Sequence, residues 1–106
     1  MTDALVVLVT APGAEEAARI ARALVEERLA ACGNVVPGLR SIYRWQGAVH
    51  EDAEALLVLK TTRDRFEALR ARVLALHPYE VPEVVALPVE AGSASYLEWI
   101  VRETSD

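Results

Sequence analysis

Apolar residues recur along this chain with the two periods that separate strands from helices. Residues 4–10 form an unbroken apolar run rich in β-branched side chains, which predicts a strand buried on both faces. From residue 14 onward, apolar side chains stand three and four positions apart, which is typical of a helix with one buried face. Because Gly33 stands where a left-handed cap is expected, we predict that this helix runs from about Ala14 to Cys32.

Residues 40–47 alternate with the period of two that a strand requires. Tyr43 and Trp45 therefore point to the same side. We expect a polar turn over 48–52, begun by the glycine before it, and a return strand over 54–60. At about 3.3 Å per residue, an outgoing strand of about ten residues reaches roughly 33 Å, whereas a helix of about 18 residues covers about 27 Å. Part of this hairpin should extend beyond its helical cover, which favours a partner chain.

The second half of the chain repeats the order of helix and strand. The predicted second helix has an apolar face made by residues at helical spacing: Phe66, Leu69, Val73 and Leu76. We expect Thr62 to cap its N-terminus and Pro78 to end it at or before His77. Residues 78–82 should be irregular, and 83–87 should form another strand.

A capping box at residues 95–98 predicts a short terminal helix. The predicted order is therefore strand, helix, strand, strand, helix, strand and a last helix. Right-handed crossovers place both main helices on one face of a four-stranded sheet. We predict an α+β fold, a ferredoxin-like βαββαβ sandwich with an extra C-terminal helix. Since the other sheet face is left bare, a partner subunit is its expected cover.

Composition narrows the possible function classes. A chain of 106 residues has room for one domain, residues 1–106, with one modest core. Its net charge of −5 and the absence of a basic run argue against a nucleic-acid partner. With neither a membrane span nor a signal-peptide pattern, we expect a cytoplasmic protein. A single cysteine excludes an internal disulfide.

His77 is the first candidate for metal chemistry. It stands where the second helix ends, and acidic residues follow shortly after it. One interpretation is a metal ligand with Glu80 or Glu83 as a second donor. The other is a helix-terminal histidine that the helix dipole favours or that bonds to a turn. A neighbouring chain would have to supply further ligands, since one histidine makes a poor site.

Two other groups carry donor atoms. Cys32 has a soft thiol, but we interpret it as a small packed residue at a helix end. The segment 50–52 and Glu54 bring an imidazole and three acidic side chains to the predicted turn. Exposed acidic turns are normally only solvated, and no oxygen-ligand loop spacing is present, so we interpret this cluster as solvated.

A possible inter-subunit cleft involves Tyr43, Trp45, Glu54, Lys60 and Tyr79. Glu54 and Lys60 bracket the return strand, and they either pair across such a cleft or mark where the strand reaches water. The aromatic residues either line a ligand pocket or pack subunits together. Nucleophile elbows, phosphate loops and zinc-protease motifs are missing, so we predict that the protein is not an enzyme and needs no organic cofactor.

Several motifs in this order resemble the CutA divalent-cation-tolerance family. They are Leu29–Cys32 with Asn34, Ser41–Gly47, Glu54, Lys60–Thr61, His77–Pro82 and Tyr96–Trp99. The resemblance implies a cytoplasmic ferredoxin-like homotrimer, similar in build to PII-type signalling proteins, and a link to copper and other divalent metals. Some bacterial members carry a cysteine and a first histidine where this chain has Val9 and Leu76, so only His77 of that ligand set is present.

These observations predict a trimeric protein of divalent metal tolerance. It would bind Cu²⁺ or another divalent cation weakly at inter-subunit clefts, with His77 and Glu80 as ligands. The alternative is a trimeric signalling or scaffold protein that binds a small effector or a protein partner, with metal binding incidental. Neither interpretation involves nucleic acid or a membrane.

Overall fold

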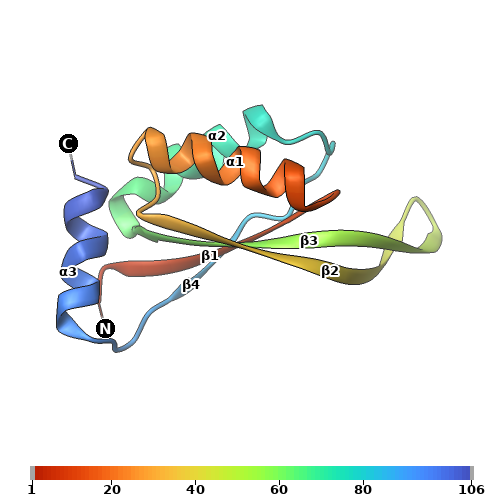
Figure 1. Cartoon of the computed structure of the whole chain (residues 1–106). Helices are drawn as coiled ribbons and strands as arrows, with labels where there is room; N and C mark the ends of the chain where they lie inside the picture. Colours follow the sequence, from red (N-terminus) through yellow and green to blue (C-terminus); the bar gives the residue numbers. More distant parts are fainter. Residues whose placement is uncertain (1, 106) are drawn as a thin grey trace.

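The computed structural model describes residues 2–105, which fold into four strands and three α-helices (Figure 1). The strands are β1 (Ala4–Ala11), β2 (Cys32–Trp45), β3 (Ala48–Thr62) and β4 (Val85–Pro88). The helices are α1 (Ala14–Glu26), α2 (Phe66–Leu76) and α3 (Ala94–Glu103), and a 3₁₀ turn, η1 (Arg63–Arg65), leads into α2. Within the described part of the chain, no helix is long and apolar enough to cross a membrane.

The four strands form one antiparallel sheet in the order β2-β3-β1-β4. Each helical connection, through α1 and through α2, crosses over one intervening strand. Both helices consequently lie side by side on one face of the sheet, while α3 stands at the end of the sheet where the chain begins (Figure 1). The predicted α+β class and the order of its elements are confirmed.

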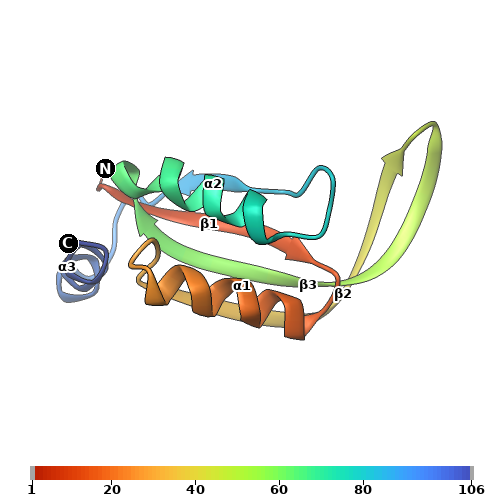
Figure 2. The same ribbon diagram turned by 90° about the horizontal axis from the view of Figure 1, so that it is seen from above.

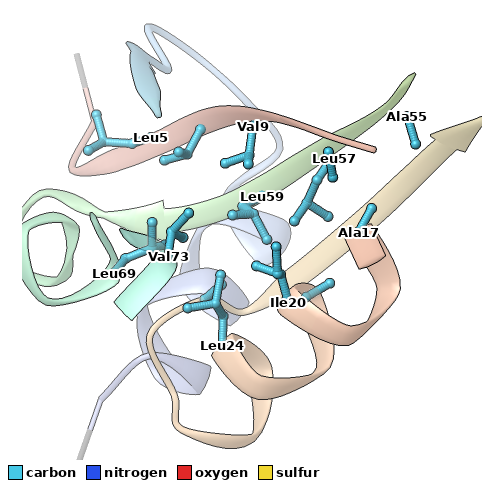
Figure 3. Packing of buried hydrophobic residues seen from close by; sticks show 14 residues of the cluster. Leu5, Val9, Ala17, Ile20, Leu24, Ala55, Leu57, Leu59, Leu69 and Val73 are labelled. Atoms are coloured by element: carbon cyan, nitrogen blue, oxygen red, sulfur yellow. The ribbon is translucent and has the colours of Figure 1, made fainter. Parts of the chain in front are cut away.

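The core lies between this sheet and the two helices (Figure 3). Ile20 and Leu24 of α1 and Leu57 and Leu59 of β3 are fully buried there. Gly33 of β2 allows α1 to approach, because a Cβ atom at this position would stand 3.0 Å from both the Cβ of Ala21 and a methyl group of Leu59. The glycine is needed for close packing between helix and sheet.

The opposite sheet face has no helix over it among the described elements. Along β1, fully buried residues alternate with partly buried ones, and Val6, Leu8 and Thr10 are the partly buried set. β4 lies at the sheet edge, where Val85 and Leu87 are exposed. An apolar surface of this kind is available to a partner, as the sequence predicted.

The prediction that the first helix reaches Cys32 is wrong. The helix ends at Glu26, and Arg28 has a φ of 60°, which reverses the chain. The guanidinium of Arg28 donates hydrogen bonds to the carbonyls of Glu103 and Ser105 at 3.1 and 3.3 Å. It thereby satisfies free carbonyls at the end of α3. Helix α1 itself ends in a Schellman cap, because the N–H of Leu29 donates to the carbonyl of Leu24 and the N–H of Arg28 donates to that of Val25.

The hairpin turn also differs from the prediction. Gln46 and Gly47, with φ values of 49° and 82°, form a two-residue turn, and residues 48–52 belong to β3 instead of a polar turn. Two consecutive positive φ values match the right-handed twist of a hairpin. The strand is bent at Pro37-Gly38, where the pairing register shifts between Val36 and Leu39.

The hairpin extends well past the helices, as predicted (Figure 1). It gives the molecule a longest extent of 44 Å against 25 and 22 Å in the other directions. In Figure 2 it bends toward the side on which the segment between α2 and β4 lies. These two parts enclose the candidate site.

The helix caps are only partly as predicted. Thr62 does not cap α2 with its side chain; its hydroxyl donates to the carboxylate of Asp64 at 2.6 Å, and η1 intervenes. The capping box at residues 95–98 is wrong, since Ser93 is the N-cap residue of α3 and makes no side-chain cap. The end of α2 at His77 and the irregular segment after it are confirmed.

Candidate functional site

A cavity of about 720 Å³ lies between the hairpin and the segment after α2. The hairpin supplies residues 41–43, Trp45, Asp52 and Glu54, and the segment supplies residues 78–81 and Glu83. Two chain segments far apart in sequence therefore form its walls. We call this cavity the hairpin pocket.

His77 anchors the segment wall of the hairpin pocket. The ring is buried, with Nε2 at 2.7 Å from the carbonyl oxygen of Thr10 and Nδ1 at 3.1 Å from the backbone nitrogen of Tyr79. Because a carbonyl only accepts and an amide N–H only donates, Nε2 carries the proton and Nδ1 accepts. Both ring nitrogens are thus used inside the protomer.

Two tyrosine hydroxyls bind carboxylates in the pocket. Tyr79 donates to a carboxylate oxygen of Glu54 at 2.6 Å, which links the segment to β3. Tyr43 donates to Asp52 across the hairpin, and its ring stacks on His50 with centroids 5.5 Å apart. The pairing of Tyr43 with His50 in the β2–β3 register explains both contacts.

The environment of these tyrosines favours their neutral form. The pKa of Tyr79 is raised well above its ordinary value of 10.0, first by burial and then by the hydrogen bond to Glu54. The pKa of Tyr43 is raised chiefly by its hydrogen bond to Asp52. Ionisation would remove the donated proton and place a second negative charge beside a carboxylate.

Tyr79→Phe should lower the free energy of unfolding at neutral pH and have a smaller effect in alkaline solution. A pKa raised in the folded state contributes stability that is fully present below pH 10 and is lost as the pH rises through the folded pKa. The wild type should therefore be more stable than the variant at neutral pH, and the difference should shrink above pH 10. Urea denaturation over this pH range measures it; a constant difference would contradict the assignment.

All charged residues that line the hairpin pocket, among those described, are acidic. Asp52, Glu54, Glu80 and Glu83 line it, and none of its described lining residues is basic. Lys60, which was predicted to share a cleft with Glu54, lies elsewhere and donates a hydrogen bond to the side chain of Asn34. The pocket therefore attracts cations and repels anions.

The other predicted donors lie outside this site or apart from one another. Cys32 is not packed at a helix end as predicted; it begins β2, is partly exposed, and its sulfur stands 3.6 Å from the hydroxyl oxygen of Tyr96. Glu51, expected in a turn, lies in β3 and pairs with Arg40. Among residues 2–105, no three histidine, cysteine or acidic side chains stand close enough to hold a metal ion.

The sequence interpretation missed Asp52 as a pocket residue, because it placed this residue in the turn. Gln46-Gly47 was the available signal, since two residues of this kind between alternating segments fit a tight hairpin. Shifting the turn there puts Asp52 on the same side as Tyr43. Of the predicted cleft residues, Tyr43, Trp45, Glu54 and Tyr79 do line one pocket.

Comparison with known proteins gives a consistent result over nearly the whole chain. The model of one protein family, described as CutA1 divalent ion tolerance protein, matches residues 5–103. A divalent-cation tolerance protein CutA of Thermus thermophilus is 62% identical over 99 residues, which are 93% of this chain and 96% of that protein. The chloroplastic protein CutA 1 of Oryza sativa is 47% identical over 96% of this chain, which spans 58% of the rice protein.

The fold agrees with that likeness. The solved structure of a divalent cation tolerance protein from Thermus thermophilus matches with a TM-score of 0.94 and 60% sequence identity, covering 96% of this chain and 99% of that one. Sequence and backbone thus point to the same group of proteins.

Proposed function

We propose that this chain, which belongs to the CutA1 divalent ion tolerance protein family, acts in cation tolerance. It would do so by binding cations in the hairpin pocket. The observation that carries this proposal is the uncompensated charge of the pocket, with four carboxylates and no basic residue among its described lining. Oxygen donors of this kind bind divalent cations. The protein would be a non-enzymatic binding protein of the cytoplasm.

Binding in one protomer would be weak. Three or more donors must converge within about 2.0–2.6 Å of a divalent ion, and the described side chains do not form such a set. Glu80 is our proposed metal contact, together with Glu54. The prediction that His77 is a ligand would require its ring to release one of its two backbone hydrogen bonds.

We propose that a neighbouring subunit completes the site. The proposed assembly is a homotrimer of PII-like build, made of single-domain ferredoxin-like protomers. Its support is the projecting hairpin, where Ile42 and Val49 are 68% and 63% exposed, and the partly buried free face of the sheet. Apolar side chains on an uncovered strand pair are normally buried in an interface.

Titration calorimetry with Cu²⁺ tests the site. Glu80→Gln should weaken binding about fivefold, because loss of one carboxylate near the ion removes about 1 kcal/mol of attraction. Glu98→Gln is the matched control, since this exposed residue of α3 lies outside the pocket. Equal affinity of both variants would rule out the hairpin pocket as the metal site. Calorimetry on His77→Ala tests the ligand predicted from sequence.

A second candidate function is a trimeric scaffold that binds a protein partner or a small effector. The exposed apolar residues Ile42, Val49 and Val81 favour it, the last with 69% of its surface exposed. They would be hidden in a trimer or used by another protein. Sedimentation of the wild type and of Ile42→Ser distinguishes the two possibilities. If these residues hold the trimer together, the variant should sediment as a smaller particle; if they bind another protein, its mass should not change.

A further inference from the structure

The hairpin pocket is much larger than a bare metal ion. Its volume of about 720 Å³ falls within the roughly 300–1,000 Å³ range of small-molecule sites. A divalent ion requires oxygen atoms at about 2.0–2.6 Å on several sides, and no such group of side chains exists among residues 2–105. The cavity therefore has space for a molecule instead of an ion alone.

Aromatic side chains on both walls are left partly exposed. Tyr43 and Trp45 come from β2 and Tyr79 comes from the opposite segment; their exposed fractions are 41%, 37% and 37%. The faces of such rings attract organic cations, and the attraction increases when water is displaced. Val81 adds apolar surface against which a hydrocarbon chain can lie.

The carboxylates are also divided between the two walls. Asp52 and Glu54 lie on β3, and each accepts one tyrosine hydroxyl, which leaves further lone pairs for other donors. Glu80 and Glu83 lie on the opposite segment, where neither has a hydrogen-bond partner among the described residues. A ligand with one cationic centre would leave part of this charge unmatched.

We propose that the hairpin pocket binds a linear aliphatic polyamine. Protonated amino groups would donate hydrogen bonds to carboxylates on both walls, and the methylene chain would lie against the aromatic and apolar surface between them. A quaternary ammonium ion fits less well because it has no N–H to offer the carboxylates. The inference rests on the proposed function in that it takes the same cavity as the cation site.

Calorimetry with spermidine, at constant ionic strength and on the full chain, tests the inference. The double variant Glu80→Gln/Glu83→Gln should lower the affinity at least about tenfold, and Trp45→Leu should lower it about threefold. The control Glu90→Gln/Glu98→Gln removes the same charge from exposed positions outside the pocket and should leave binding unchanged. Absence of binding, or an equal loss in the control, would overturn the proposal.

Competition by Mg²⁺ separates recognition of the amine from simple charge attraction. Putrescine has the same charge as Mg²⁺ and should displace spermidine at a lower concentration, because it can also use the aromatic surface. Equal displacement would show only diffuse electrostatics and would overturn the proposal. A Cu²⁺ titration of the same samples keeps the two ideas distinguishable: if Cu²⁺ binds and spermidine does not, the polyamine inference falls and the metal proposal stands.

Discussion

Replacing Leu59 by alanine is expected to lower the free energy of unfolding by about 2–5 kcal/mol, the range for removing a large buried aliphatic side chain. Leu59 is fully buried near the C-terminal end of β3, between β1 and β2 and beneath α1 (Figure 3). Its removal takes apolar surface out of the core and leaves a cavity that the sheet cannot close. Urea denaturation at one fixed protein concentration measures the loss.

Gly33 provides a control for that prediction. Gly33→Ala alone should destabilise by about 1–3 kcal/mol, because the new methyl group would stand 3.0 Å from a methyl of Leu59 and from the Cβ of Ala21. In the Leu59→Ala background the first of these clashes disappears. The double variant should therefore lose less than the sum of the single losses, by about 0.5 kcal/mol or more. Strict additivity would show that the two residues do not share this space.

His77→Ala is expected to lower the free energy of unfolding by about 2–4 kcal/mol. His77 is only 7% exposed, and removal of its ring would leave the carbonyl of Thr10 and the N–H of Tyr79 without their partners. The loss of packing against the ring of Tyr79, 4.6 Å away between centroids, adds to this cost. Denaturant unfolding at neutral pH measures the difference.

The other histidine supplies a matched comparison. His50 is exposed on the hairpin, where it stacks on Tyr43, so His50→Ala should cost only about 0.5–1 kcal/mol. If both variants lost the same stability, His77 would have no special structural role. That result would revive the interpretation that its ring is free to bind a metal ion.

The order of strands and helices could be predicted because it depends on local periodicity. β1, the apolar face of α2 and the stop at His77 all follow from residue types within a few positions. The end of α1 could not be predicted in this way, because Arg28 stands at the left-handed cap position that a glycine usually marks. Arg28 leaves the helix and satisfies carbonyls of Glu103 and Ser105, which are more than seventy positions away in the chain. No spacing rule reports such a contact.

The position of the hairpin turn was predicted wrongly for a different reason. Beyond the core both faces of β2 and β3 meet water, so polar residues such as Glu51 and Asp52 stand inside a strand where a turn was expected. Alternation of apolar and polar residues marks a strand only when one face is buried. Backbone geometry at Gln46 and Gly47, and not polarity, determines where this chain turns.

The candidate site could be predicted in part. Tyr43, Trp45, Glu54, Tyr79 and Glu80 do meet in the hairpin pocket, because the motifs that suggested them lie on its two walls. Lys60 does not, since it lies six positions beyond Glu54 along an extended strand and bonds to Asn34. To bind a metal ion, His77 needs a ring nitrogen with a free lone pair. In the folded chain both ring nitrogens are engaged, one with the carbonyl of Thr10 and the other with the N–H of Tyr79, and the sequence does not report these hydrogen bonds.

The position of α3 has a practical consequence. This helix packs beside the start of β1 through Ile100 and Ala4, so both ends of the chain emerge on the side of the molecule away from the projecting hairpin (Figure 1). An affinity tag, a fluorescent fusion or a covalent link to a sensor surface can therefore be attached at either terminus. In each case the hairpin pocket stays open to solution, and the protein can be immobilised in a uniform orientation for ligand screening.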